Sequence, residues 1–431
     1  MSADASPETI PDGWECLSLS DVCLNVSKID PLDLGRKEFK YIDIGSIDSS
    51  TNSVTSPQML NVDDAPGRAR QLVRSGDSVF STVRPYLRKI AYVDENLDSE
   101  IASTGFCVIR PNPSKVLPRF IRFFSISDNL MEQVLPLQRG VSYPAVRDKE
   151  VLSTRILVPS LSEQERIVEI LEEQLSRLDA ALASVNAVRE KSARFRRSLL
   201  HAAFTGALAG HDVSDETLPA GWVKGTIGHV ADVVGGRTPT KFEQRLESSP
   251  TVNRSVPFYK VGDMNSAVRY LSESRVYFAE SETGLFGIEI LPSGTVIFPK
   301  AGGAIATNKK RILDVPGAID LNCMGLKPNG ELLPKLLYWF FESFNLSSIA
   351  DGSVLPQIGK KKVAGIVICY PVNLVEQQKL LDEIEASISK SDEADLIAES
   401  IEKKSSALRR SLLHAAFTGV LTKEWREGAH V

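Results

Sequence analysis

One eleven-residue string occurs twice in this sequence. Arg-Arg-Ser-Leu-Leu-His-Ala-Ala-Phe-Thr-Gly occupies residues 196–206 and again residues 409–419. The offset of 213 residues is close to half of the 431-residue chain, and a period this long lies far outside the range of solenoid repeats. The chain is therefore two copies of one unit, and each copy ends in the same helical segment.

Further landmarks recur in the same order in both halves, while the segments between them differ. They are Pro-x-Gly-Trp at 11–14 and 219–222, Arg110-Pro111-Asn112 and Lys327-Pro328-Asn329, the Pro-led apolar stretches 118–124 and 334–341, Gly-x-x-x-Pro at 140–144 and 352–356, and Glu163-Gln164 and Glu376-Gln377. A shared frame with two different contents predicts an internal pseudo-two-fold repeat of two similar domains.

The segment before the first repeated string has the apolar spacing of a long helix. Its apolar residues are three and four positions apart, as in a coiled-coil heptad: Val168, Leu171, Leu175, Leu178, Leu182 and Val185. The second copy keeps Leu381, Ile384 and Ile388 in register but has Ser391 and Asp395 where leucines are expected. A seam this long and narrow favours an intramolecular coil of the two helices. Two separate helices, each packed on its own domain, are the alternative.

The segments between the landmarks indicate mixed α/β structure with short strands. Residues 41–45 and 258–262 are predicted to be equivalent strands, and so are residues 76–80 and 294–298. The expected fold class is α/β (mixed α+β). Its expected parts are an N-terminal tail 1–11, a first domain 12–160, a central helical segment 161–206, a linker 207–218, a second domain 219–372, a C-terminal helical segment 373–420 and a tail 421–431.

Composition excludes some classes of protein and leaves others open. No apolar run reaches the roughly 18 residues that span a bilayer, and residues 1–11 lack the basic and apolar regions of a signal peptide. The five cysteines form no Cys-x-x-Cys pair, which indicates a reduced, cytoplasmic setting. The net charge of −5 is unevenly distributed: residues 12–160 hold 18 basic and 19 acidic side chains, and residues 220–372 hold 17 and 13. Charge is a weak argument for or against nucleic acid binding.

No catalytic motif was found in the sequence. It has no Gly-x-x-x-x-Gly-Lys-[Ser/Thr] phosphate loop and no Asn/Asp-Pro-Pro-Tyr/Phe step of amino-methyltransferases. Asp33, Glu38 and Lys40 are too close in sequence to place acids on adjacent strands around one metal ion, and the five histidines show no ligand spacing. We expect no catalytic site and no metal site on this chain.

These landmarks together resemble the specificity (S) subunit of type I restriction-modification enzymes, over nearly the whole chain. The resemblance rests on the two Pro-x-Gly-Trp openings, the Gly-x-x-x-Pro steps, Pro159 and Pro371 at strand ends, the Glu-Gln helix openings and the Leu-Leu-x-Ala-Ala-Phe-x-Gly endings. Residues 235–239, Gly-Gly-Arg-Thr-Pro, are similar to the Gly-Gly-Thr-Pro step of that family, with Arg237 inserted.

The resemblance implies a function and partners. Two target recognition domains would each read one half of a split site in double-stranded DNA, and the two long helices would form an antiparallel spacer. Two methyltransferase (M) subunits would dock on the chain, joined by restriction (R) subunits in the full complex. The chain itself would be non-catalytic and cytoplasmic, with no cofactor of its own, because S-adenosylmethionine, ATP and Mg²⁺ would belong to the partner subunits. The alternative is a helical protein-interaction scaffold without a DNA role, or a fragment of a fused restriction-methylation enzyme.

The candidate DNA-binding residues are basic side chains near tight turns, where they can approach phosphates or guanine edges. They are Arg84, Arg88 and Lys89 in the first half, and Arg237, Lys241, Lys300, Lys309, Lys310, Arg311 and Lys360 in the second. For any one of them the alternative is a solvated surface charge.

The candidate docking residues lie in the repeated string. They are Leu199, Leu200 and Phe204 in the first copy, and Leu412, Leu413 and Phe417 in the second. Two identical surfaces are what two identical partners require, so one methyltransferase subunit is expected near each copy. The alternative is that Phe204 and Phe417 close the core of each domain.

Overall fold

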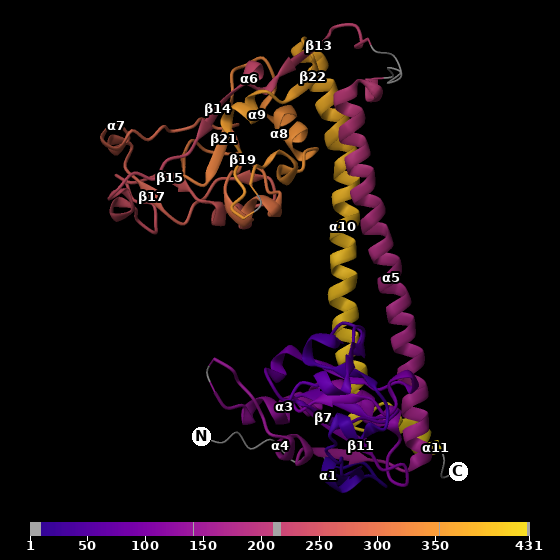
Figure 1. The fold of residues 1–431 in the computed structure, drawn as a ribbon. Coiled ribbons are helices and arrows are strands. Elements are labelled where there is room, and N and C mark those ends of the chain that lie inside the picture. Colours follow the sequence, from indigo (N-terminus) through magenta and orange to yellow (C-terminus); the bar gives the residue numbers. More distant parts are fainter. Residues whose placement is uncertain (1–9, 141, 210–216, 353, 429–431) are drawn as a thin grey trace. The chain divides into compact units, whose positions relative to one another are not determined.

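Two compact units make up the protein in the computed structural model, which describes residues 10–140, 142–209, 217–352 and 354–428 (Figure 1). The first unit contains residues 1–185 and 399–431, and the second contains residues 186–398. The division passes through both long helices, α5 (Leu161–Thr205) and α10 (Leu374–Phe417). Each unit therefore combines one globular domain with one half of each long helix.

The domain of the first unit contains two four-stranded sheets and a two-stranded ribbon. One sheet has the order β2 (Cys23–Leu24), β11 (Phe106–Pro111), β8 (Ser78–Ser81), β9 (Ile90–Tyr92), and the other β6 (Gln58–Asn61), β3 (Glu38–Ile42), β10 (Ile101–Ser103), β7 (Ala69–Leu72). The ribbon pairs β1 (Glu15–Ser18) with β12 (Arg155–Val158), and β4 (Ile47–Asp48) pairs with β5 (Ser53–Val54). The helices are α1 (Leu19–Val22), α2 (Pro118–Ile126), α3 (Asp128–Val134) and α4 (Asp148–Leu152).

The domain of the second unit repeats this plan with different sheet edges. Its larger sheet has the order β14 (Ala231–Gly235), β21 (Cys323–Pro328), β18 (Val296–Pro299), β19 (Arg311–Leu313), β16 (Tyr270–Leu271). A smaller sheet has the order β17 (Tyr277–Phe278), β15 (Val256–Tyr259), β20 (Ala318–Ile319), and β13 (Trp222–Thr226) pairs with β22 (Val367–Pro371). The helices are α6 (Ile227–Val230), α7 (Thr283–Phe286), α8 (Pro334–Glu342) and α9 (Lys360–Ala364). The predicted mixed α/β class and internal repeat are confirmed.

The predicted strand pairs occur, with small shifts at their ends. Strands β8 and β18 begin two residues after the predicted starts at Gly76 and Gly294 and end one residue after the predicted ends. Strands β3 and β15 end earlier than predicted, because the chain turns into a 3-10 helix directly after each of them. The turn after β3 is fixed by Asp43, whose carboxylate accepts a 2.9 Å hydrogen bond from the backbone N–H of Ser46. This short capping contact ends the strand.

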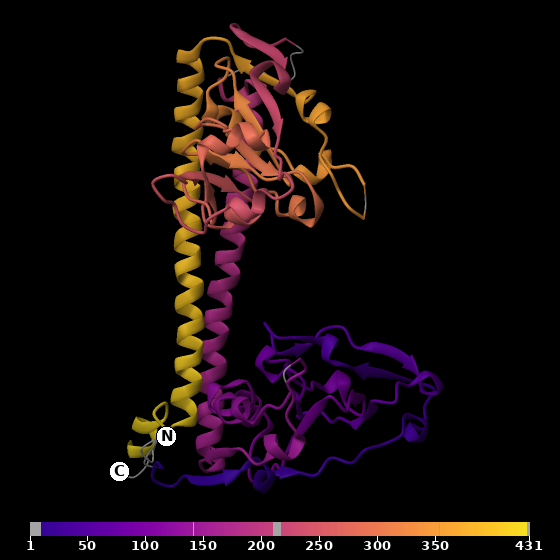
Figure 2. The same cartoon turned by 90° about the vertical axis from the view of Figure 1, so that its left-hand side faces the viewer.

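The two long helices pair within each unit (Figure 1, Figure 2). In the first unit Asp179 of α5 forms an ion pair with Arg409 of α10. The start of α5 lies beside the segment that follows α10, since Glu163 accepts a 2.7 Å hydrogen bond from Arg426 in the last helix, α11 (Lys423–Gly428). Residues later in α5 therefore lie beside residues earlier in the α10–α11 segment. The two helices are antiparallel, as predicted.

A polar layer interrupts the seam in the second unit, at the two positions where leucines are missing. Ser391 is buried and shares a hydrogen bond with Ser192 of α5. Arg196 donates hydrogen bonds of 3.1 Å to Ser391, 2.8 Å to Asp392 and 3.1 Å to Asp395. The break in the apolar repeat thus has a physical reason, because the polar residues of α10 are the partners of an arginine on α5.

A buried glutamine anchors the start of each long helix. In the first unit the side-chain oxygen of Gln164 accepts a hydrogen bond from the backbone N–H of Leu117 at 2.8 Å, and its amide donates to the backbone oxygens of Lys115 and Pro159, both at 3.0 Å. Gln377 makes the same three contacts in the second unit, with Leu333, Glu331 and Pro371, each at 2.9 Å. The repeated Glu-Gln step is therefore a structural lock that ties each helix to the loop before α2 or α8.

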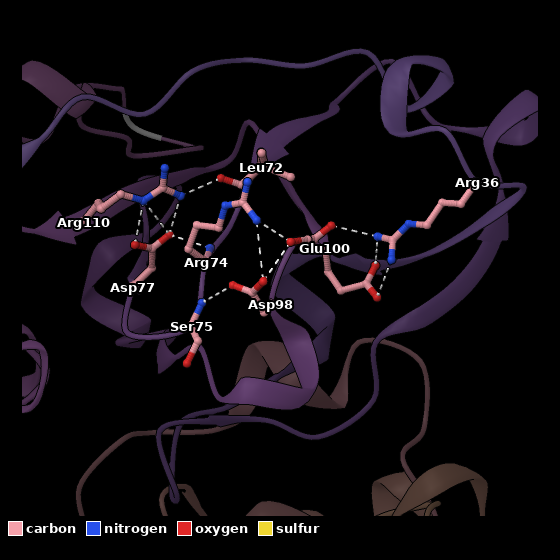
Figure 3. Close-up of polar contacts among 9 residues, drawn as sticks. Arg36, Leu72, Arg74, Ser75, Asp77, Asp98, Glu100 and Arg110 are labelled. Atoms are coloured by element: carbon pink, nitrogen blue, oxygen red, sulfur yellow. Dashed lines mark hydrogen bonds and ion pairs between the residues drawn. The ribbon is translucent and has the colours of Figure 1, made fainter.

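Ion pairs hold the frame of the first domain around the β8–β11 pair (Figure 3). Asp77 is 1% exposed and accepts hydrogen bonds from Arg110 at 2.7 and 2.9 Å. Burial raises the pKa of Asp77, and the contacts with Arg110 and the backbone N–H of Arg74 oppose that rise. Beside this pair, Arg36 binds the carboxylate of Glu100 at 2.6 Å. These ion pairs therefore stabilise the strands of the first domain.

Candidate DNA-binding and partner-docking surfaces

The Gly-x-x-x-Pro loop is bonded to the same neighbouring turn in both units. In the first unit the backbone N–H of Arg84 donates to the backbone oxygen of Pro144 at 2.7 Å. In the second unit the N–H of Gly302 donates to Pro356 at 2.8 Å. The glycine that opens each loop has a positive φ, +93° at Gly140 and +87° at Gly352, a conformation that other residues adopt only under strain. Each unit thus holds the proline end of this segment beside the turn after β8 or β18.

The tips of these loops expose large side chains that differ between the units. Tyr143 is 72% exposed, and the guanidinium of Arg84 lies over its ring at 4.9 Å from the centroid. In the second unit the matching position holds Leu355, which is 73% exposed. Sequence reasoning did not select either tip residue, although the Gly-x-x-x-Pro spacing marks both. A cation over an aromatic face on a fixed loop is suited to contact with phosphates and bases.

The first predicted basic cluster contains one side chain that could contact DNA and two that are bonded within the domain. Arg88 forms an ion pair with Asp128, and Lys89 donates a 2.6 Å hydrogen bond to the backbone oxygen of Ile47. Arg84 and Arg88 both have positive φ, +48° and +50°, and strained backbone of this kind gathers at functional sites. Of the three residues, Arg84 is the one whose charged group stacks at the exposed loop tip.

The second predicted cluster requires a correction at Lys310. Its side chain is fully buried and donates hydrogen bonds to Asn308 Oδ1 at 3.0 Å and to the backbone oxygen of Phe344 at 2.7 Å, so it cannot reach DNA. Burial lowers the pKa of Lys310 to about 8. Arg311 is half-buried and bonds the backbone oxygen of Lys310 at 2.6 Å, and Lys309 bonds Asn265. The three basic residues are adjacent in sequence but do not form one surface: Lys309 and Lys310 precede β19, Arg311 is its first residue, and Lys310 is buried.

Three predicted residues far apart in sequence converge in the second unit. Arg237 and Lys360 line a pocket of about 210 Å³ together with the backbone of Gly235 and Gly236. The ammonium groups of Lys300 and Lys360 both lie within 3.5 Å of the point that a Cβ on Gly235 would occupy. Lys241 is exposed and lies outside this pocket. The structure therefore brings Lys300 and Lys360 together at Gly235, and Lys360 also lines the pocket that contains Arg237, which the sequence alone did not indicate.

The predicted docking side chains are mostly buried inside the protein. Leu199, Leu200 and Phe204 belong to the core of the second unit, where the ring of Phe204 lies 5.1 Å from that of Phe340. In the first unit Leu413 and Phe417 are buried and Leu412 is half-buried. Phe417 packs against Phe120 at 5.1 Å and Phe124 at 5.3 Å. These apolar residues offer no exposed docking surface, so their role in partner contact is corrected to core closure.

Each repeated string closes the domain of the other repeat. The copy at 196–206 ends the first half of the sequence but packs on the second domain, and the copy at 409–419 packs on the first domain. Both copies also expose the same three residues, at Arg197, Ser198 and His201 and at Arg410, Ser411 and His414. Core packing explains the identity of the buried positions. It does not explain the identity of the exposed ones.

Metal and membrane sites receive no support from the described residues. Within residues 10–140, 142–209, 217–352 and 354–428, no group of three or more His, Cys, Asp or Glu side chains is placed to hold a metal ion. No helix in that part of the chain has the length and apolar character needed to cross a membrane.

Comparison with known proteins places this architecture in one family. The model of the type I restriction modification DNA specificity domain matches residues 11–184 and 219–399. The HindI specificity subunit of Haemophilus influenzae is 29% identical over 37% of this chain and 34% of its own length. The EcoKI specificity subunit of Escherichia coli is 21% identical over 97% and 91%.

Solved structures give the same result. A chain of a type I R-M system, solved to explain complex assembly and conformational transition, is 27% identical, with a TM-score of 0.79 over 96% of this chain and 100% of that one. The HsdS subunit from Thermoanaerobacter tengcongensis is also 27% identical, with a TM-score of 0.55 over 96% and 99%. The chain therefore belongs to the family of type I restriction modification DNA specificity domains, and it carries two of them.

Proposed function

We propose that this chain is the non-catalytic specificity subunit of a type I restriction-modification system, and that each of its domains reads one half of a bipartite site in double-stranded DNA. The observation that carries this proposal is the proline of the Gly-x-x-x-Pro step, which accepts the same backbone hydrogen bond in both units but follows an exposed Tyr143 in one and an exposed Leu355 in the other. The same backbone arrangement with a different exposed side chain in each domain suits the reading of two unlike half-sites.

Partner subunits supply the chemistry in this proposal. Two methyltransferase subunits dock on the chain, and restriction subunits join through them. S-adenosylmethionine, ATP and Mg²⁺ belong to those partners, and the complex acts in the cytoplasm. The docking surface is assigned to the exposed residues of the repeated string, Arg197 and His201 in one unit and Arg410 and His414 in the other, because two identical partners require two identical surfaces.

A titration at fixed salt tests the DNA-reading role. The full chain with its methyltransferase partner is titrated with duplexes that carry the host's methylated sequence and with duplexes in which that sequence is scrambled. A DNA-reading subunit binds the first set at least about 1,000-fold more tightly. A protein-interaction scaffold gives one shallow affinity that is blind to sequence and falls steeply with salt.

Charge reversal tests the docking surface. Replacing Arg197 and His201 by Glu is expected to reduce the methyltransferase content of the complex from two copies to one, and replacing Arg410 and His414 as well is expected to remove both. Arg194 and Lys403 are exposed on the same two helices but lie outside the string, so Arg194→Glu and Lys403→Glu serve as the matched control. Two bound copies in every variant, measured by native mass spectrometry, would exclude this surface.

A further inference from the structure

The basic pocket of the second unit is organised around glycine. A Cβ on Gly235 would lie 2.7 Å from Cε of Lys360, so a larger residue would displace the lysine side chain. It would also lie 3.3 Å from Nζ of Lys300 and 3.5 Å from Nζ of Lys360. Two ammonium groups that share so small a space repel each other unless an anion lies between or beside them.

Two backbone hydrogen bonds hold Lys300, one at its N–H and one at its carbonyl oxygen. Its N–H donates to Asn322 at 2.8 Å, and its backbone oxygen accepts from the N–H of Ile358 at 2.8 Å. Lys360 is the first residue of α9, two positions after Ile358. The position of the two lysines is therefore set by the fold of the domain.

Within the described part of the chain, neither ammonium group has a carboxylate within ion-pair distance. The acidic side chain that lines the pocket is Glu289, and its carboxylate is bonded to Lys327 at 3.0 Å. The nearby Asp320 accepts its hydrogen bonds from Asn322. Arg237, which also lines the pocket, donates to the backbone oxygen of Gly287 at 3.4 Å. Lys327 also pairs with Asp232 at 3.6 Å, so Glu289 belongs to a separate group of charges. Among the described residues, Lys300 and Lys360 thus lack an ion-pair partner of their own.

The first unit has no positive charge at either of the matching positions. Its corresponding backbone contact joins the N–H of Val146 to the oxygen of Thr82 at 2.9 Å, so Thr82 corresponds to Lys300. Helix α4 begins two positions after Val146, at Asp148, just as α9 begins at Lys360. The shared frame therefore carries a lysine pair in one domain and threonine with aspartate in the other. The net charge is also more positive in the second domain, with +4 for residues 220–372 against −1 for residues 12–160.

We propose that Lys300 and Lys360 bind one backbone phosphate of DNA and that the first domain has no equivalent of this site. The proposal rests on the DNA-reading function given above. A phosphate contact carries no sequence information of its own, so this pocket holds the second domain on the duplex whichever bases it reads. The two domains consequently contribute unequally to the salt-dependent part of the affinity.

A reciprocal exchange in the full chain tests the site. The variant Lys300→Thr/Lys360→Asp gives the second domain the residues of the first, and Thr82→Lys/Asp148→Lys does the reverse. Affinity for duplex DNA is measured by fluorescence anisotropy over a series of NaCl concentrations. Loss of one phosphate contact is expected to reduce the slope of log K against log [salt] by about 0.9, and gain of one is expected to increase it by about 0.9.

A control variant separates the pocket from overall charge. Lys403→Thr/Lys404→Asp removes the same charge from exposed positions of α10 and is expected to leave the slope unchanged. The ratio of affinities for target and scrambled duplex should be the same in the wild type and in the pocket variant, because a lost phosphate contact weakens all sequences alike.

Three results would overturn the proposal. They are an unchanged slope in the pocket variant, an equal fall in the control variant, and tight binding of inorganic phosphate to the wild-type chain by calorimetry, which would make the pocket a site for free anions. A wild-type chain that binds DNA without sequence discrimination would instead contradict the specificity function while leaving the slope test valid.

Discussion

Arg196 of α5 donates a 2.8 Å hydrogen bond to Asp392 of α10 within the second unit. Arg196 is the first residue of the repeated string, and its counterpart Arg409 pairs with Asp179 in the first unit. Both copies of the string therefore begin with an arginine that reaches an aspartate on the opposite long helix.

This polar layer predicts a non-additive response to mutation. Ser391→Leu restores the apolar repeat but removes a partner of Arg196, so we expect it to destabilise the second unit by about 1 kcal/mol. Arg196→Leu combined with Ser391→Leu should cost less than the sum of the two single changes, since the buried contact between them is removed as a whole and the partly exposed Asp392 and Asp395 remain in reach of water. A double-mutant cycle by urea denaturation measures the coupling. Additive effects of the two changes would show that the layer does not act as a unit.

The buried glutamines predict a large effect from a small change. Gln164→Ala leaves one backbone N–H and two carbonyl oxygens without partners, at a cost of about 3 kcal/mol. Gln377→Ala should cost a similar amount in the second unit. Gln378 is exposed and its side chain donates to Asp382 on the same helix, so Gln378→Ala is the control and should change the free energy of unfolding by less than about 0.5 kcal/mol. If all three variants lost less than about 0.5 kcal/mol of unfolding free energy, the buried glutamines would not anchor the helices.

Because each repeated string packs into the core of one domain, the structure predicts which domain is destabilised when a phenylalanine of that string is replaced. Phe204→Ala should destabilise the second domain by about 3–5 kcal/mol, although Phe204 belongs to the first half of the sequence. Hydrogen exchange should increase around α8 in this variant and around α2 in Phe417→Ala. Phe195 is 51% exposed on the same helix, and Phe195→Ala should leave both regions protected. Faster exchange in α2 for Phe204→Ala would contradict the packing.

Lys310 predicts a rise in stability at alkaline pH. Its folded-state pKa of about 8 lies below the ordinary value of 10.5, so at pH below 8 the charged form carries the full cost of burial. Between pH 8 and about 10 the folded protein releases this proton more readily than the unfolded chain, and the free energy of unfolding gains roughly 1.4 kcal/mol per pH unit from this group. The difference between the wild type and Lys310→Met, followed by urea denaturation, should therefore grow over that window. A difference independent of pH would exclude a depressed pKa.

The repeat and the helix spacing were sufficient to predict the architecture. The duplicated string gave the two similar domains, and the heptad positions from Val168 to Val185 gave the paired helices. The exchange of strings between domains could not be predicted, because spacing shows that Phe204 and Phe417 face a partner but not which domain supplies it. A buried aromatic and a docking aromatic have the same sequence pattern.

The candidate site was only partly predictable, for reasons of the same kind. Lys309, Lys310 and Arg311 form one basic run in sequence, yet the fold buries the middle residue completely. Lys300 and Lys360 are 60 positions apart, and the backbone hydrogen bond from Ile358 to Lys300 brings their segments together beside Gly235. The Gly-x-x-x-Pro spacing marks the loop that holds Tyr143 but not the role of its ring, which becomes visible only with the guanidinium of Arg84 over its face.

The separation into two reading modules is tested most directly by exchanging one of them. Residues 12–160 are replaced by the equivalent block of a relative that keeps aromatic residues at positions 120 and 124, so that Phe417 retains its partners. The modified sequence is then determined by methylome sequencing of cells that express the chimaera with its methyltransferase. We predict that one half-site changes and the other stays the same, and that exchange of residues 219–372 does the converse. A simultaneous change of both half-sites in either chimaera would contradict the account.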